Sequence, residues 1–496
     1  MTRHLLALLA LYVLLAASYS LLVPPWEAPD ETAHYLVVEH LARRGEMPPF
    51  EQSYETVQPP GYYWLGAGVF QLIENIDSRL TTRQRPPLTP QSEYTRYGWT
   101  AQNYRFLWTM QILRWFNAAL GALALIFIFQ GARILFAAAD AGLSPGDLLP
   151  GTLPPLAVVA LVGLTPQFLH NVTAVSNDAL ANAAGAFLFW LLVRNALRPP
   201  CPLHLALAAL AATMLPFLIK LTILPLSAAL LLVLAWRAWR GQRRLLVATV
   251  VVSLFVLAAG LALAAPASAQ FLLSTLWWRL TYIRPDIYEG WSLAQILSYY
   301  AAGYWGQIGW KFAALPRWLW AALWAAVWMG AVFSLRLLFA GWQRRRFWRW
   351  IFFAATLLTA LGMLVQGLGP WWHLPWLLPV AAWTMLVLAL WRMRAHDPVR
   401  HVALPAAVWR AVWLAAGLAF LVVFRNALTT AQFQARFLFP ALGPIATIIV
   451  VGWWVFLPNR AQARLTPAIV SAFLVLNLFF WLDTIIPRFY QPFLDG

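Results

Sequence analysis

Cysteine is almost absent from the 496 residues, and the single one is Cys201. No intrachain disulfide is therefore available, so loops outside the apolar segments must be held by packing and by the membrane. Charged side chains are scarce at 11% of the residues, against about 25% in an ordinary soluble domain. Hydrophobic residues make up 61%. This balance excludes an ordinary soluble domain and predicts an integral membrane protein.

Lysine is also rare: of the 35 lysines and arginines, only Lys220 and Lys311 are lysines. A net charge of +17 would suit a nucleic-acid partner. The arginines, however, fall in short clusters between apolar runs, which is typical of topology signals and of contact with anionic lipid headgroups. We therefore expect a membrane environment and no nucleic acid.

Long apolar runs are abundant. A membrane-spanning helix needs about 20 mostly apolar residues, and thirteen runs of this kind are separated by turns rich in Pro, Gly and Arg. They lie at 4–23, 107–136, 153–172, 178–195, 203–219, 222–238, 245–265, 317–340, 350–367, 375–393, 406–424, 438–457 and 467–485. The division of 203–238 into two spans is the weakest. We expect an all-α membrane protein that forms a single domain, 1–496.

The first run follows Arg3 and His4, as the core of a signal peptide would. It is longer than the usual core of about 7–15 residues, so we interpret it as a retained anchor.

Four connections, 236–244, 341–349, 391–401 and 458–464, hold thirteen arginines, whereas 171–177, 366–374 and 425–437 hold two. The first set should be cytoplasmic. The amino terminus is then inside the cytoplasmic membrane, and the carboxyl terminus and two long loops, 24–106 and 266–316, are outside.

Acidic residues are concentrated in the first of these loops, which holds ten of the eighteen. We therefore expect 24–106 to be the catalytic loop. Within it, "YYWLGAGVFQLIE" at 62–74 is apolar but short for a span, and a crossing there would invert the arginine pattern downstream. We interpret it as a helix that lies in the membrane surface.

The segments "PDETAHYLVVEHLARRGEMPPF" and "YETVQPPGYYWLGA" resemble the first periplasmic loop of polytopic glycosyltransferases of the C-type fold, particularly relatives of aminoarabinose and protein mannosyl transferases. In that family an acidic pair opens the loop and a "PPLYYW" helix closes it. The resemblance continues in order along the chain with "TPQFLHNVTAVSNDAL", "IKLT", "YWGQIGW" and "QARFLFPALGP". It implies transfer of a sugar from a polyprenyl-phosphate carrier to a lipid, glycan or protein acceptor on the exported side of the membrane.

Inverting transfer from a glycosyl phosphate needs a carboxylate to take the acceptor's proton, and cations or a metal to neutralise the departing phosphate. Asp30 suits the first task, because it precedes a predicted helix that ends at Gly45, where the helix dipole keeps a carboxylate ionised. The alternative is that Asp30 is only an N-cap. Glu31, the second acid of the pair and a further catalytic candidate, faces solvent or orients a neighbour. His34 orients Asp30 or binds a metal, or is simply a packed histidine.

Asp178 in "SNDAL" is the second acidic candidate, as the only carboxylate between Asp147 and Asp286. The alternative is again an N-cap, for which Ser176 and Asn177 compete. The resemblance implies that an acid in this short outer loop faces the first-loop acid across the active site. If a divalent metal takes part, Asp30, Asp178 and His34 are its candidate ligands; no cofactor is certain.

Three basic residues are candidates for the phosphate. Lys220 interrupts "LPFLIKLTILPL", where a cation must be paired or must reach the surface by snorkelling. Arg436 stands at the outer end of a span, and the resemblance favours a functional role for it. Arg284 is weaker, because Asp286 and Glu289 offer it surface partners.

Gln58 departs from the basic residue or histidine that the resembling families place before the "PP" pair, which puts a phosphate contact there in doubt. The resemblance also places Tyr62 and Tyr63 at the substrate. Aromatic residues crowd the second outer loop, where they either line a donor groove or gather at the membrane interface for physical reasons alone. A transporter or flippase is the main alternative function, but the predicted spans are almost free of charge and show no internal repeat.

Overall fold

Helices make up nearly all of the regular structure in the computed structural model, which describes residues 3–81, 104–140, 153–198, 201–239, 242–264, 303–308, 313–338, 406–430, 434–457, 459–487 and 489. The exception there is a short antiparallel pair, β1 (Gln307–Ile308) and β2 (Ala313–Ala314). The prediction of an all-α protein is thus confirmed in its main point.

Eight helices in the described part of the chain are long and apolar enough to cross a membrane, or nine if one bent pair counts as a span. They indicate a multi-pass membrane protein. The elements involved are α1 (Arg3–Leu22), α5 (Tyr104–Asp140), α8 (Asp178–Leu197), η5 (Leu221–Ile223) with α10 (Leu224–Ala238), α11 (Arg243–Ala264), α17 (Ala406–Thr430), η7 (Ala435–Ala441) with α18 (Leu442–Phe456), and α20 (Leu465–Phe480) with η8 (Trp481–Ile485). The shorter α9 (Pro202–Leu218) precedes α10, so 203–238 does form two helices.

Eleven of the thirteen predicted runs coincide with helices, including α14 (Arg317–Leu338). Runs 350–367 and 375–393 lie outside the described residues, and the total of thirteen spans stays a prediction. The predicted span 153–172 is two helices, α6 (Leu153–Gly163) and α7 (Pro166–Val172), that meet at 65°. The break falls just before Pro166, which lacks the N–H needed to continue the hydrogen-bond ladder. After this break, α7 leads into the short connection before α8.

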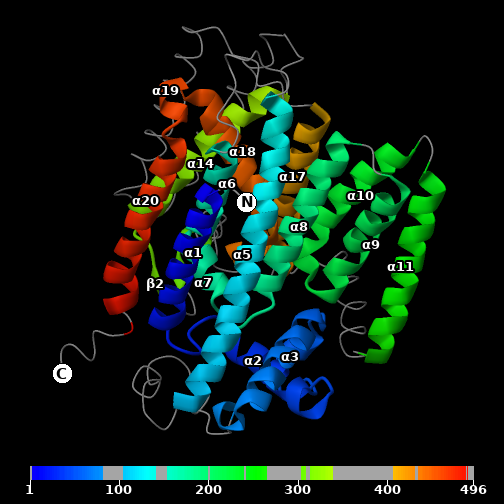
Figure 1. Ribbon diagram of the computed structural model, residues 1–496, viewed down its shortest axis with the longest axis vertical. Helices are drawn as coiled ribbons and strands as arrows, with labels where there is room; N and C mark the ends of the chain where they lie inside the picture. The colour runs from blue at the N-terminus through cyan, green and yellow to red at the C-terminus, as the bar shows by residue number, and fades with distance from the viewer. Residues whose placement is uncertain are drawn as a thin grey trace.

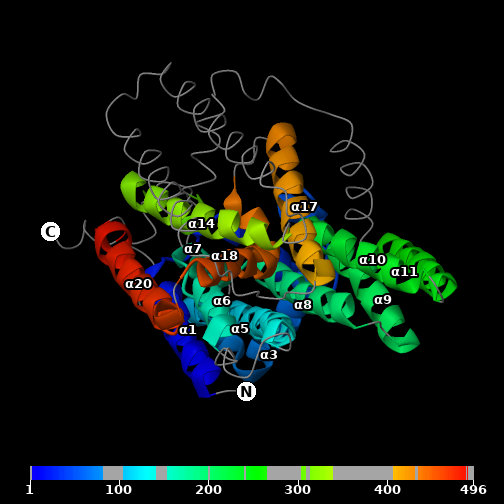
Figure 2. The same ribbon diagram turned by 90° about the horizontal axis from the view of Figure 1, so that it is seen from above.

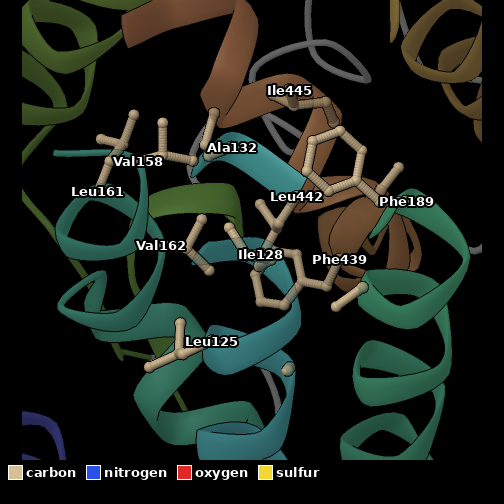
Figure 3. Packing of buried hydrophobic residues seen from close by; sticks show 14 of the residues in the cluster. Leu125, Ile128, Ala132, Val158, Leu161, Val162, Phe189, Phe439, Leu442 and Ile445 are labelled. Atoms are coloured by element: carbon tan, nitrogen blue, oxygen red, sulfur yellow. The ribbon is translucent and has the colours of Figure 1, made fainter. Parts of the chain in front are cut away.

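The core of the bundle lies where α5, α6, α8 and α18 meet. Leu125 and Ile128 of α5 face Val158 and Val162 of α6, and the ring of Phe189 from α8 packs near Leu442 and Ile445 (Figure 3). Lipid tails are as apolar as these side chains, so close van der Waals packing between the helices, and not removal from water, holds this part of the bundle together. α5 runs through this core and continues beyond it to the end of the molecule where the first loop folds (Figure 1).

The first loop forms a compact unit at one end of the bundle, consisting of α2 (Glu31–Arg44), η1 (Tyr54–Val57) and α3 (Gly61–Ile76) (Figure 1). A second apolar cluster joins α2 and α3 to the start of α5, with Val38, Phe70 and Met110 fully buried. α2 ends at Gly45 in the left-handed conformation, φ 75°, as predicted. Glycine carries no Cβ penalty there.

The segment predicted to lie in the membrane surface is helical as α3, which packs against α2. Its outward face is apolar, with Trp64, Leu65, Leu72 and Ile76 all exposed. That pattern suits an interfacial helix, although its position in a membrane stays a prediction.

The arginine-rich connection 458–464 contains α19 (Asn459–Gln462), which lies at the opposite end of the bundle from α2 and α3 (Figure 1). In the view from above, α14 and α17 border one side of the bundle (Figure 2).

Candidate functional site

Four charged residues that lie far apart in the sequence meet where the first loop covers the bundle. The guanidinium of Arg436 bridges two carboxylates: Nη2 donates to Asp30 Oδ2, and Nη1 lies 3.4 Å from Asp178 Oδ2. Lys220 Nζ donates to Asp178 Oδ1. Two cations and two carboxylates thus form one neutral cluster, and all four are residues that the sequence singled out.

The carboxylate of Asp30 does not cap α2. Asp30 occupies the N-cap position, but its side chain makes no capping hydrogen bond and its backbone is left-handed, with φ 65° and ψ 0°. Instead Oδ1 accepts a hydrogen bond of 2.8 Å from the Tyr54 hydroxyl while Oδ2 accepts from Arg436. The alternative that Asp30 is only an N-cap is therefore wrong. A non-glycine residue with positive φ is uncommon and signals strain held by its surroundings.

Two opposing effects set the pKa of Asp30. Burial raises it, but the positive charge of Arg436, the nearby His34 and the hydrogen bonds from Arg436 and Tyr54 outweigh burial, so that the pKa lies below the usual 3.8. Asp30 is therefore ionised at neutral and mildly acidic pH. A carboxylate in that state accepts protons.

Asp178 is the first residue of α8, and here too the N-cap interpretation is wrong, because its side chain points to cations instead of the helix end. Oδ2 accepts a hydrogen bond of 3.0 Å from Asn171 Nδ2, and Oδ1 accepts from Lys220. Its side chain is only 5% exposed. The carboxylate is held ionised by two cations in a place where an unpaired charge would be costly.

Hydrogen-bond donors of the two cations are only partly used within the described residues. Arg436 donates to Gln434 and Asp30 and faces Asp178, which leaves at least two of its five N–H groups available. Lys220 donates to Asp178 and, at 2.7 Å, to Asn177 Oδ1, which leaves one of three. The Nδ2 of Asn177 is buried and has no hydrogen-bond partner among the described residues. The cluster therefore offers donors to an anion.

Two glycines allow the segments of the cluster to meet. A Cβ on Gly185, two turns after Asp178 in α8, would collide with the carbonyl of Pro440 in η7, the element that holds Arg436. A Cβ on Gly61 at the start of α3 would collide with the carbonyl of Leu218, just before Lys220. Only glycine permits backbones to approach this closely. These contacts seat the Arg436 segment against α8 and the first loop against the Lys220 segment.

Glu31 does not face solvent, and that interpretation is wrong: the residue is completely buried. Its carboxylate forms a bidentate ion pair with Arg114 of α5, with Nε to Oε1 at 2.9 Å and Nη2 to Oε2 at 2.7 Å. Backbone N–H groups of Val175 and Trp26 donate to the same two oxygens at 2.9 and 3.0 Å. Glu31 is therefore enclosed by donors beside Asp30 and does not join the Asp30 cluster.

His34 is buried on α2, close to the charged cluster. Its Nδ1 is 2.9 Å from the hydroxyl of Tyr63, on whose ring it stacks, and 3.8 Å from Glu55 Oε2. Burial lowers the pKa of His34, and Lys220 lowers it further, against the raising effect of Glu55 and Asp30. The His34 backbone N–H donates to the Asp30 carbonyl at 3.0 Å within the first turn of α2, but the imidazole does not bond the Asp30 carboxylate, which accepts from Tyr54 and Arg436.

Tyr62 and Gln58 are the remaining predicted site residues of the first loop. Tyr62 is buried, and its hydroxyl accepts a hydrogen bond of 3.1 Å from Asn117. Gln58 follows η1, where its backbone N–H donates to Glu55 O at 3.0 Å.

Asp30, Asp178 and His34 do not form a metal-binding group: no cluster of three or more His, Cys, Asp or Glu suited to a metal ion occurs among the described residues.

Most of the second long loop, including Arg284, lies outside the described residues. Two of its aromatic residues, Tyr304 and Trp305, are described and are buried in the main core. Tyr304 packs edge-on against Phe439 in η7. Tyr304 thus packs on the segment that carries Arg436, and Trp305 packs on Tyr304.

Sequence reasoning assigned no contact in the site to several residues that bond the candidates, among them Tyr54, Arg114, Asn171 and Asn177. Arg114 had a usable signal, since it is a charge inside an apolar run, the same signal that identified Lys220. The other three are uncharged polar residues in polar segments. Nothing in their local sequence distinguishes them from surface residues.

Comparison with known proteins gives a weak similarity. No family model matches the chain, and no curated protein matches its sequence. The crystal structure of ArnT from Cupriavidus metallidurans bound to undecaprenyl phosphate is similar over 95% of this chain and 77% of that chain, with a TM-score of 0.36 and 12% sequence identity. Because the score and the identity are this low, this similarity carries no conclusion about fold, reaction, donor or acceptor.

Proposed function

We propose that this protein is an inverting membrane glycosyltransferase that moves a sugar from a polyprenyl-phosphate donor to a hydroxyl-bearing acceptor. One observation carries the proposal: Arg436 bridges Asp30 and Asp178 beside Lys220, in a cluster assembled from four separate segments, of which Asp178 and Lys220 are buried and Asp30 and Arg436 are partly exposed. The sequence motifs that resemble C-type-fold transferases contain all four residues, which supports the same function.

The donor phosphate would bind to the cationic side of the cluster. The spare N–H groups of Arg436 and Lys220, together with the unpartnered Nδ2 of Asn177, are the donors that a phosphate needs. As the bond between the sugar carbon and the phosphate oxygen breaks, the electron pair stays on the phosphate. Preorganised cations stabilise that developing charge in a partly dry site.

Asp30 would serve as the base. Its ionised carboxylate takes the proton of the acceptor hydroxyl while the acceptor oxygen forms a bond to the sugar carbon from the side opposite the phosphate, which inverts that carbon. Asp178 would hold Lys220 and Arg436 in place, since it bonds both. The chain's own cations account for the charge neutralisation in this scheme, and a divalent metal is not required by it.

The cluster would lie on the outer face of the cytoplasmic membrane. The first loop and α19, which lies in the arginine-bearing connection 458–464, are at opposite ends of the bundle (Figure 1), and arginine-rich connections favour the cytoplasmic side. The amino terminus is then inside and the carboxyl terminus outside. A lipid donor would reach the cluster with its phosphate at the depth of the interface.

Purified protein incubated with a panel of polyprenyl-phosphate sugars should release the free polyprenyl phosphate from at least one donor. Asp30→Asn is the inactive comparison, and Asp77→Asn, which removes a partly exposed carboxylate of the same loop paired with Arg79, is the matched control and should release it at the parent rate. Passage of intact donors across a vesicle membrane without release would contradict the proposal and favour a flippase.

Tyr54→Phe is expected to move the acid limb of the pH–turnover profile to higher pH. The Tyr54 hydroxyl is one of the hydrogen bonds that lower the pKa of Asp30. Its removal raises that pKa, so the base becomes protonated, and turnover falls, at a higher pH than in the parent. Profiles measured for Tyr54→Phe and for Tyr19→Phe, which removes a buried hydroxyl that bonds Asn477 and not Asp30, test this. Coincident acid limbs would remove Asp30 from the role of base.

A further inference from the structure

Arg114 makes an unusually complete set of hydrogen bonds. Besides the two bonds to Glu31, Nη1 donates to the carbonyls of Ser20 and Val23 at 2.9 and 2.7 Å, and Nη2 donates to the carbonyl of Pro24 at 3.1 Å. All five N–H groups of the guanidinium are thus used. The side chain is 1% exposed, and that of Glu31 is fully buried.

This pair, with its backbone partners, joins three segments. Through Ser20, Val23 and Pro24 it holds the end of α1 and the turn that follows. Through Glu31 it holds the first residue of α2, and through the Val175 N–H, bonded to Glu31 Oε1, it holds the connection that leads to Asp178 three residues later. Asp30 is therefore the neighbour of one member of this buried ion pair, and Asp178 is three residues from a backbone N–H that bonds the same member.

The backbone between these anchors is strained. Trp26 and Asp30, which flank the turn, are the two non-glycine residues with positive φ among the described residues, at 70° and 65°. The Trp26 N–H is bonded to Glu31 Oε2, and Asp30 directly precedes Glu31. Such conformations persist only where the surroundings enforce them. The bonds to Glu31 hold both ends of this turn, and the Asp30 side chain between them points away from the helix end and toward Arg436.

We propose that Glu31 and Arg114 form a positioning pair that fixes the separation of Asp30 and Asp178 around the donor phosphate, without touching substrate themselves. This inference rests on the proposed function. Its basis is the set of contacts above, since neither residue has a bond to spare for a ligand. A shift of about 1 Å in a catalytic group can lower a rate by about 10²-fold, so a loosened pair should affect the chemical step more than donor binding.

Glu31→Gln is the main test. The amide keeps the size of the carboxylate but presents N–H groups to donors, so we expect turnover of bound donor to fall about 100-fold while donor affinity stays at the parent value, because Lys220 and Arg436 are untouched. Arg114→Lys should behave alike, since a point charge cannot replace a bidentate fork. Tyr19→Phe, which removes a buried bond to Asn477 in the core, is the matched control for lost stability. Its turnover should equal that of the parent.

A second measurement separates failure of this inference from failure of the proposed function. Hydrogen exchange needs no donor: in Glu31→Gln, exchange at Trp26 and at Val175 should rise together by about tenfold or more, although the two amides are 149 positions apart in the chain, and Tyr19→Phe should leave both protected. Unchanged exchange at Val175 would overturn the pair's role. If exchange rises but turnover of bound donor in Glu31→Gln equals that of Tyr19→Phe, the pair is structural only and the inference is wrong.

Discussion

Asp30→Asn is expected to lower turnover by about 10²- to 10⁴-fold, the usual loss when a positioned base is removed. The amide has the same size and still accepts the Tyr54 hydrogen bond, but it cannot take a proton from the acceptor. Arg436 keeps its contact with Asp178, so donor binding should change little. Release of polyprenyl phosphate at saturating donor, compared with donor affinity for the same variant, measures the two effects separately.

Stability should not account for that loss. Asparagine is among the residues that tolerate the left-handed conformation best, so Asp30→Asn should unfold thermally close to the parent. Asp77→Asn provides the comparison for removal of a carboxylate elsewhere in the loop. An Asp30→Asn protein that kept most of the parent turnover, with an unchanged melting temperature, would mean that another group takes the proton.

Arg436→Met and Lys220→Met are each expected to weaken donor binding by about 10- to 100-fold. A charge-assisted hydrogen bond contributes about 1.5–3 kcal/mol, and each variant removes at least one such bond to the phosphate. The loss at Arg436 should be the larger, because Asp30 and Asp178 then share no cation. Arg436→Lys should remain impaired, since a lysine cannot bridge both carboxylates and also reach a phosphate.

Arg79→Met is the matched control for these variants, because Arg79 is an exposed arginine of the first loop that pairs with Asp77. Donor affinity is best measured with the polyprenyl phosphate alone, which separates phosphate recognition from sugar recognition. If Arg436→Met and Lys220→Met bound it like the parent, both cations would serve only to neutralise the buried carboxylates. The phosphate would then bind elsewhere.

The helices of this protein were predictable because the length of an apolar run is a local property of the sequence. Even so, 153–172 was predicted as one span, and the effect of Pro166 on it was missed. The predicted end of α2 at Gly45 was accurate, since glycine marks a left-handed cap. Tertiary geometry, such as the 65° angle between α6 and α7, has no comparable signature.

The charged members of the site were predictable for a physical reason: a charge in or beside an apolar run is costly unless it has a partner. That reasoning identified Lys220, Asp178 and Arg436, and applied to the run 107–136 it would also have identified Arg114. It could not show that Glu31 points into the protein and Asp30 toward Arg436. Their orientations depend on the positive φ of Asp30, which contacts distant in sequence impose.

The most direct test of the central claim is a structure of the protein with a polyprenyl phosphate bound. The account predicts the phosphate within hydrogen-bond distance of Lys220 Nζ and the Arg436 guanidinium, on the side of these two cations that faces Asp30. A phosphate bound instead among the arginines at the other end of the bundle, near Arg194 or Arg237, with the cluster unchanged, would contradict it.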